Sequence, residues 1–393
     1  MKIAVFLSRF PYPLIKGDKL RAYNQIVQLA KRHEVYLFCL SDERIENDWI
    51  EQLRPFCKEI EIGKLNKFSS LLNVSLAFFS QLPLQTAFYK SNKIKQQYNA
   101  FLQKVKPDVC YYQFVRTMPY AEGVALPQVL DFQDTLSANM ERRAGKSNAF
   151  LKPFFLMEAK RLRRYEFKAM NLFDAQTIIT DADRQLLPSN AKNKVAIVSN
   201  GVSQRYVDEV ETKEKKYDVL FCGNMGYKPN ITAADYLIRS IMPLVRKQRP
   251  QTTLCIAGVN PPSAIKAMAN KMNLIIEKVD DMRQMYLQSK VFIAPMQIGT
   301  GLQNKLLEAM SCEIPSISSP LANNALQAEH NKEILIANKD QEYADCILKL
   351  LNDESLAKKL ALNGREYILE NFRWEKCNEE LEKVLAKVVS HKD

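Results

Sequence analysis

Residues 294–319 constrain the fold most, because an apolar run leads there into a glycine-flanked turn and then a helix. Residues 291–295 are typical of a buried parallel strand, and residues 302–310 favour an uninterrupted helix. Gly299 and Gly301 permit the tight backbone geometry of a turn between these elements. The N-terminus of such a helix presents unpaired N–H groups and a positive dipole end. It therefore predicts a site for an anion, above all a phosphate or diphosphate.

Two charged residues lie three positions apart on this predicted helix and therefore share one face. The ammonium group of Lys305 suits a phosphate, whereas the carboxylate of Glu308 suits the hydroxyl groups of a sugar or ribose. A second interpretation remains open at this point. In this second interpretation, Lys305 and Glu308 form a solvated ion pair, and the glycines only make a turn.

The chain opens with a strand expected at residues 2–9, followed by a long loop, a helix expected at 20–32 and a second strand expected at 35–40. This pattern is typical of a doubly wound α/β domain. Further strands are expected at 109–114, 128–132, 174–180, 195–202, 217–222, 253–258, 274–277 and 291–295, and helices at 341–352, 355–371 and 374–390. A chain of 393 residues is long enough for two such domains. The lysine-rich stretch 209–216 marks a boundary, which gives domains at 1–208 and 209–373 and a terminal helix at 374–393.

The net charge of +12 and the isoelectric point near 9.1 call for an anionic partner. Nothing resembles a zinc finger, an RNA-recognition motif or a helix-turn-helix, so a membrane surface ranks above nucleic acid. No apolar run approaches the roughly 20 residues that span a bilayer, and the N-terminus lacks a signal-peptide pattern. The sequence therefore predicts a cytoplasmic protein. Three histidines and scattered cysteines make a metal site improbable.

Residues 64–106 are the best candidate for contact with a membrane. Apolar and aromatic side chains alternate there with lysines, as in surfaces that bind anionic lipid. They are Phe68, Leu71, Leu72, Phe78, Phe79, Phe88 and Tyr89, interleaved with Lys64, Lys67, Lys90, Lys93 and Lys95. The alternative is that these aromatics pack the core. The basic stretch 150–170 is predicted to be a long solvated helix.

Polar residues end two predicted strands of the first domain. Gln113 ends one strand, and Asp131 and Asp134 lie at the end of the next. The carboxyl ends of strands in such sheets face the ligand crevice, which makes these residues site candidates. Asp181 and Asp183 form a D-x-D, but their place between a strand and a helix favours helix capping.

The segment GLQNKLLEAMSCEIPSISS resembles the donor site of retaining glycosyltransferases of family four, which have the GT-B fold. The resemblance implies that Glu308 binds the ribose hydroxyls of a nucleotide-sugar. The sugar-phosphate end is then held by Gly301, Leu302, Gln303 and Asn304. Thr300 stands where the family usually has a first glutamate, and Glu313 stands where glycine is usual. We interpret Lys305 as a partial replacement for the missing glutamate.

The N-terminal string RFPYPLIKGDKLRAY is similar to that of bacterial exopolysaccharide-type sugar transferases of group 1. In GT-B enzymes this loop faces the cleft, which implies that Gly17 approaches the donor. Asp18 and Lys19 would then lie on the acceptor side with Gln113, and Arg21 would take a catalytic place. The segment VLDFQDTLS resembles the family's aspartate loop on the acceptor side of the cleft. The resemblance thus gives Asp134, Lys305 and Arg21 as catalytic candidates.

The turn GNMGYKPN resembles the same branch and predicts a second anion-binding helix N-terminus. It supplies Gly223, Asn224 and Met225, and Lys228 as a second cation for the diphosphate. Val279 opens a loop that, in the family, receives the nucleobase through backbone groups.

The resemblance implies two facing doubly wound domains with a cleft between them and a last helix that crosses back to the first domain. The implied reaction transfers a sugar from a nucleotide diphosphate sugar to a hydroxyl acceptor with retention of configuration. It needs no metal or other cofactor. A lipid-linked or cell-surface glycan is the expected acceptor, at the inner face of the cytoplasmic membrane. Two alternatives remain open: a nucleotide-sugar epimerase of the same fold, and a degenerate nucleotide- or glycan-binding protein.

Overall fold

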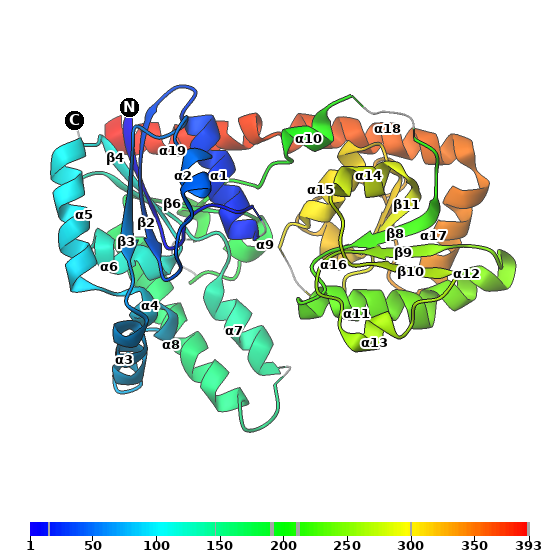
Figure 1. Ribbon diagram of the computed structural model, residues 1–393, viewed down its shortest axis with the longest axis horizontal. Coiled ribbons are helices and arrows are strands. Elements are labelled where there is room, and N and C mark those ends of the chain that lie inside the picture. The colour runs from blue at the N-terminus through cyan, green and yellow to red at the C-terminus, as the bar shows by residue number, and fades with distance from the viewer. Residues whose placement is uncertain (15, 146, 189–191, 210–212, 299–300, 391–393) are drawn as a thin grey trace. The chain divides into compact units, whose positions relative to one another are not determined.

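The computed structural model describes residues 1–14, 16–145, 147–188, 192–209, 213–298 and 301–390, and it divides into two compact units. The first unit comprises Met1–Ser199 and Cys377–Asp393, and the second comprises Asn200–Lys376. Each unit is a parallel sheet with helices packed on both faces (Figure 1). The architecture is that of two Rossmann-like α/β domains, as the strand and helix pattern predicts.

The sheet of the first unit has the order β3-β2-β1-β4-β5-β6-β7, with every pairing parallel. The strands are β1 (Lys2–Leu7), β2 (Glu34–Ser41), β3 (Glu59–Lys64), β4 (Val109–Gln113), β5 (Gln128–Asp131), β6 (Ala175–Ile178) and β7 (Ala196–Ile197). The order reverses between β1 and β4, and ligands of such sheets bind outside the carboxyl ends of strands at that point.

Helices cover both faces of this sheet and bury two apolar clusters against it. They are α1 (Gly17–Leu29), α2 (Asn47–Glu51), α3 (Lys67–Ala77), α4 (Leu84–Tyr89), α5 (Asn92–Val105), η1 (Val115–Thr117), α6 (Met118–Ala121), α7 (Leu136–Gly145), α8 (Lys152–Leu172), α9 (Asp181–Arg184), η2 (Lys192–Lys194) and α19 (Trp374–Ser390). The terminal helix α19 contributes Leu381, Leu385 and Val388 to the cluster that contains Ile3 and Val5.

The sheet of the second unit has the order β10-β9-β8-β11-β12-β13, again all parallel. Its strands are β8 (Tyr217–Cys222), β9 (Leu254–Ala257), β10 (Asn273–Ile276), β11 (Ser289–Ala294), β12 (Ser316–Ser318) and β13 (Leu335–Ile336). Its helices are α10 (Gln204–Val207), α11 (Lys228–Tyr236), η3 (Leu237–Ile241), α12 (Met242–Gln248), α13 (Ser263–Lys266), α14 (Met282–Leu287), α15 (Asn304–Ser311), α16 (Pro320–Asn323), α17 (Asp340–Asn352) and α18 (Glu354–Asn371). The order reverses between β8 and β11, so this unit also has a binding edge.

The structure differs from the sequence-based expectation at the boundary between the units. Val202 pairs with Arg373 and donates its N–H to Phe372 O, which ties residues 200–202 to the second unit. The division therefore falls after Ser199 and not after residue 208. Lys215, in the expected linker, donates to Leu287 O and packs in the second unit.

The prediction that residues 150–170 form a solvated helix is wrong for its carboxylates. Glu158 is buried in α8 and accepts hydrogen bonds from the N–H groups of Leu84 and Gln85, at the start of α4. Glu166 is fully buried and accepts from the N–H and hydroxyl of Ser137 in α7. Both carboxylates thus bind helix N-termini, where unpaired N–H groups favour negative charge.

No helix in the described part of the chain is long and apolar enough to cross a membrane. The eight cysteines are free thiols, and all except Cys346 are buried.

Candidate functional site

Two neighbouring strands of the second unit lead to the candidate donor site. Strands β8 and β11 pair in parallel, with Val219 opposite Val291, so their carboxyl ends meet at one edge of the sheet. Helices α11 and α15 begin just beyond these ends. Neither N-cap residue, Tyr227 or Gln303, makes a capping side-chain hydrogen bond. Two helix N-termini with orphan N–H groups therefore lie at neighbouring strand ends, which favours an anion with two negative groups.

Lys305, in the first turn of α15, joins the two loops. Its Nζ donates to Asn230 Oδ1 at 2.5 Å and lies 4.8 Å from the centre of the Phe221 ring. Asn230 in turn donates from Nδ2 to the carbonyl oxygen of Asn224 at 2.9 Å. The ammonium group is thereby fixed against the turn that follows β8.

Lys305 has no salt bridge with any of the described residues. Among the described residues no carboxylate lies within ion-pair distance of its Nζ, and Glu308 is bonded to Tyr286 instead. The ion-pair interpretation of Lys305 and Glu308 is therefore wrong. Burial lowers the pKa of Lys305 to about 8, while the nearby Cys222 and Glu308 act in the opposite direction.

Gly223 follows β8 at a position with no room for a side chain. A Cβ there would lie 2.7 Å from Asn230 Nδ2 and 3.1 Å from Lys305 Nζ, and φ is +156°. Gly258 is also required, because its Cβ would approach the Gly223 carbonyl oxygen to 1.9 Å. The two glycines thus allow the turn to pack closely against Asn230, Lys305 and the loop after β9.

Glu308 lies one turn further along α15 and is held by a tyrosine. The hydroxyl of Tyr286 donates to Glu308 Oε2 at 2.8 Å and lies 3.0 Å from Cys222 Sγ. The Tyr206 ring packs on Tyr286 with 5.9 Å between centres, and Arg205 donates to the Tyr206 hydroxyl. Burial raises the pKa of Glu308, and the hydrogen bond from Tyr286 opposes that rise. A carboxylate fixed in this way can accept hydrogen bonds from ligand hydroxyls.

The residues just before α15 lie where the resemblance places the sugar-phosphate end. Gly301, Leu302 and Gln303 are half-buried, and Gln303 Nε2 donates to Gly301 O at 2.9 Å. Asn304 Oδ1 is buried and has no hydrogen-bond partner in the described part of the chain. Thr300 lies outside the described residues.

The other predicted donor residues fall into two groups. Asn224, in the turn after β8, and Lys228, the first residue of α11, are exposed, and Asn224 Oδ1 accepts from Gly226 N. Met225 is 1% exposed and belongs to the apolar core, so its side chain is not available to a ligand. Val279 is half-buried after β10, and its side chain packs on the same core.

In the first unit, the N-terminal motif lies after β1. Helix α1 begins at Gly17, so Asp18 belongs to its first turn and is not its N-cap. Asp18 accepts from Arg9 Nη1 at 3.2 Å, whereas Lys19 donates to the Tyr12 carbonyl oxygen at 3.0 Å. A Cβ on Gly17 would meet nothing within 4 Å.

Two predicted site residues are internal and have no exposed face for a ligand. Arg21 is fully buried, and its Nε and Nη2 donate to the two carboxylate oxygens of Asp131 at 2.7 and 3.1 Å. Arg21 therefore has a structural role and not the expected catalytic one. Gln113 is 3% exposed and is bonded to Gln25 and Gln133. This buried polar network fixes the carboxyl ends of β4 and β5.

Asp134 remains a candidate site residue. It follows β5, and its Oδ2 accepts from Asn139 Nδ2 at 2.9 Å, while Oδ1 has no hydrogen-bond partner in the described chain. Burial raises the pKa of Asp134 to about 6, and the charge of Asp183 acts in the same direction. Arg116 opposes the rise, and its guanidinium stacks on Phe114 at 4.0 Å.

The sequence-based reasoning missed Asn230, Tyr286 and the pair Arg205–Tyr206. Asn230 ends the GNMGYKPN string, so its place in that motif was the available signal. Tyr286 and Tyr206 lie on short helices distant in sequence from Glu308, and no local pattern connects them.

Comparisons with known proteins find similarity to glycosyltransferases. Residues 216–353 match a family model described as Glycosyl transferases group 1. An uncharacterized 44.6 kDa protein in the cps region of Klebsiella pneumoniae is 25% identical, over 94% of this chain and 96% of that protein. The capsular polysaccharide biosynthesis glycosyltransferase CapM of Staphylococcus aureus is 26% identical, over 56% of this chain and 63% of CapM.

Among solved structures, the Anabaena protein HepE in complex with UDP and glucose superimposes with a TM-score of 0.66. The match covers 98% of this chain and 100% of HepE at 15% sequence identity, so it supports the fold alone.

Proposed function

We propose that this chain, a glycosyltransferase of the group 1 type with the GT-B fold, uses its second unit to bind a nucleotide diphosphate sugar and transfers the sugar to a hydroxyl acceptor with retention of configuration. The observation that carries the proposal is the geometry of α15. Lys305 is fixed against the turn after β8, and Glu308, one turn along, is fixed by Tyr286. Lys305 lies in the first turn of α15, and neither α11 nor α15 has a side-chain cap.

In this proposal the diphosphate meets the N-terminal N–H groups of α11 and α15 together with Lys305. Lys228 supplies a second cation at the start of α11. These groups stabilise the negative charge that develops on the leaving diphosphate. Glu308 accepts hydrogen bonds from ribose hydroxyls, and the backbone near Val279 receives the base. The charge of the leaving group is then met by protein groups, so the transfer proceeds without a metal ion.

The chemical step is a front-face substitution. The acceptor oxygen bonds to the anomeric carbon while the bond from that carbon to the diphosphate oxygen breaks, and the acceptor proton passes to the leaving phosphate. Asp134, in the first unit, binds and orients the acceptor hydroxyl. The names of the cps-region relative and of CapM support a glycan acceptor in polysaccharide biosynthesis.

Product stereochemistry tests this proposal. The purified chain is incubated with each of a panel of nucleotide diphosphate sugars and a hydroxyl acceptor, and the anomeric configuration of the product is read by NMR. Retention together with release of the nucleotide diphosphate is the expected result. An inverted product would contradict the mechanism, and a donor epimerised without transfer would favour the epimerase. Binding without any release of nucleotide would favour a degenerate binding protein.

The Asp134→Asn variant tests the role given to the leaving phosphate. We expect a raised KM for the acceptor with a smaller change in kcat, because the variant weakens positioning and removes no obligatory base. If transfer is abolished and a more acidic acceptor hydroxyl restores it, Asp134 is the base and the front-face step is wrong.

A further inference from the structure

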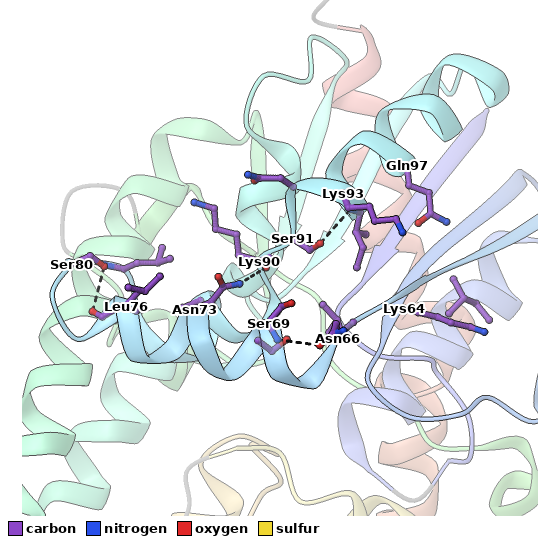
Figure 2. Close-up of a pocket in the computed structure, with 18 residues that line it drawn as sticks. Lys64, Asn66, Ser69, Asn73, Leu76, Ser80, Lys90, Ser91, Lys93 and Gln97 are labelled. Carbon is purple, nitrogen blue, oxygen red and sulfur yellow. Dashed lines mark hydrogen bonds between the residues drawn. The ribbon is translucent and has the colours of Figure 1, made fainter.

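The first unit contains a pocket of about 1030 Å³ between α3 and the N-terminus of α5, lined by neither Asp134 nor Asp18. Figure 2 shows that its polar side chains come from the end of β3, from α3, from the turn before α5 and from the first turns of α5. Lys64, Asn66, Asn73, Lys90, Ser91 and Lys93 are among them.

The charge on the lining of this pocket has one sign. Lys64, Lys90 and Lys93 line it, and no aspartate or glutamate does so. None of these lysines has an ion pair or side-chain hydrogen bond within the described chain. Three uncompensated cations around one concave surface attract an anion strongly.

Small polar side chains also line the pocket. Ser70 is among them and is 2% exposed. Helices α3 and α5 also begin at the pocket, with Asn66 and Ser91 as their N-caps, so two positive dipole ends face it.

Exposed apolar side chains also lie on α3, just after it and just before α8. Phe68 and Phe79 are 79% and 94% exposed on and after α3, and Phe150, just before α8, is 89% exposed. The two helices belong to one surface, because the Phe78 and Phe154 rings lie 6.3 Å apart. Figure 1 shows α3 and the N-terminal half of α8 at the same end of the first unit. Exposed apolar side chains together with cationic ones on neighbouring segments are typical of proteins that insert shallowly into anionic membranes.

We infer that this face of the first unit docks on an anionic bilayer, with the phosphate of a lipid headgroup in the pocket and the exposed aromatic side chains among the acyl chains. Phe88 and Tyr89 belong to no such surface, since Phe88 is half-buried and Tyr89 is 6% exposed. The inference does not depend on glycosyl transfer, and its test measures binding and not turnover. A free phosphate has the same chemistry as the headgroup but would not use the aromatic side chains.

Co-sedimentation with vesicles of phosphatidylcholine, with and without phosphatidylglycerol, tests this inference on the full chain. The first variant replaces Lys64, Lys90 and Lys93 with glutamine. The matched control replaces Lys271, Lys358 and Lys359, which are exposed in the second unit, and changes the net charge equally. A second variant, Phe68→Ser with Phe79→Ser, removes only exposed apolar surface.

We expect the wild type to bind only the anionic vesicles. The pocket variant should lose roughly a hundredfold in partition coefficient, about fivefold per lysine, and the control less than about threefold. The phenylalanine variant should lose at least about tenfold. Equal losses in the two lysine variants would overturn the inference, since they would indicate net charge alone. If calorimetry detects binding of inorganic phosphate while the chain does not bind vesicles, the inference that the pocket holds a lipid headgroup is wrong.

Discussion

The Nζ of Lys305 lies 2.5 Å from Asn230 Oδ1, so the helix after β11 is fixed to the helix after β8 by one polar contact. This contact places a cation where the two helix N-termini meet. It also gives Asn230 a role that its identity alone does not suggest, because the amide both accepts from Lys305 and donates to the loop that carries Gly223.

Replacing Lys305 with methionine should weaken binding of the nucleotide diphosphate by roughly tenfold to a hundredfold, since charge-assisted hydrogen bonds are worth about 1.5–3 kcal/mol. Isothermal titration calorimetry measures this affinity. The Lys290→Met control removes a cation that pairs with Asp218 at the far end of β11 and should leave the affinity unchanged. Equal affinities for wild type and Lys305→Met would remove Lys305 from the donor site.

Nucleotide affinity should depend on pH in a direction set by Lys305. The pKa of Lys305 is lowered to about 8, so the group is charged below that pH and neutral above it. Affinity for the nucleotide diphosphate should therefore be constant from about pH 6.5 to 7.5 and should fall by up to about tenfold per pH unit above pH 8. The Lys305→Met variant should show no such fall. A wild-type profile that stays flat to pH 9.5 would contradict the account.

Arg21 should control stability and not donor binding, because its ion pair with Asp131 is fully buried. Arg21→Met leaves a buried carboxylate without its partner and should cost about 3–5 kcal/mol of unfolding free energy. Urea denaturation measures the loss. Lys104→Met, which breaks an exposed pair with Glu59, is the control and should change stability little. An unchanged midpoint for Arg21→Met would contradict the structural role.

Glu313 occupies a left-handed backbone conformation with φ of +54°, two residues after the end of α15. Glycine adopts this conformation without strain, so Glu313→Gly should stabilise the chain by about 0.5–1 kcal/mol despite losing the contact with Arg365. The same substitution at Glu366, inside α18, should destabilise by about 1 kcal/mol. Thermal unfolding of the two variants compares the signs, and destabilisation by Glu313→Gly would show that the contact with Arg365 dominates.

Much of the fold could be predicted because buried parallel strands are continuous apolar runs. Strands β8 and β11 lie where such runs predict them, and helices α17, α18 and α19 follow the expected ranges. Strand β3 was missed because it is a half-exposed edge strand in which glutamates alternate with isoleucines. Strands β12 and β13 are two or three residues long and carry too little pattern.

The candidate site could be predicted only where its signal is local. Lys305 and Glu308 share a helix face through their spacing, and both contacts that fix them come from distant segments. The N-terminal motif misled the assignment of Arg21, because only the three-dimensional structure shows Asp131 beside it. The basic composition of residues 150–170 predicts a solvated helix and gives no sign that Glu158 and Glu166 are buried. Both bind helix N-termini far away in sequence.

Thermal denaturation with UDP, GDP, ADP and TDP, run beside Glu308→Gln, tests the donor site most directly. A nucleotide at about 100 times its dissociation constant should stabilise the wild type by roughly 2.7 kcal/mol. The account predicts that one nucleotide does so and that the effect collapses in Glu308→Gln, while the exposed control Glu277→Gln keeps it. No stabilisation by any of the four, or equal stabilisation of Glu308→Gln and wild type, would contradict a donor site on α15.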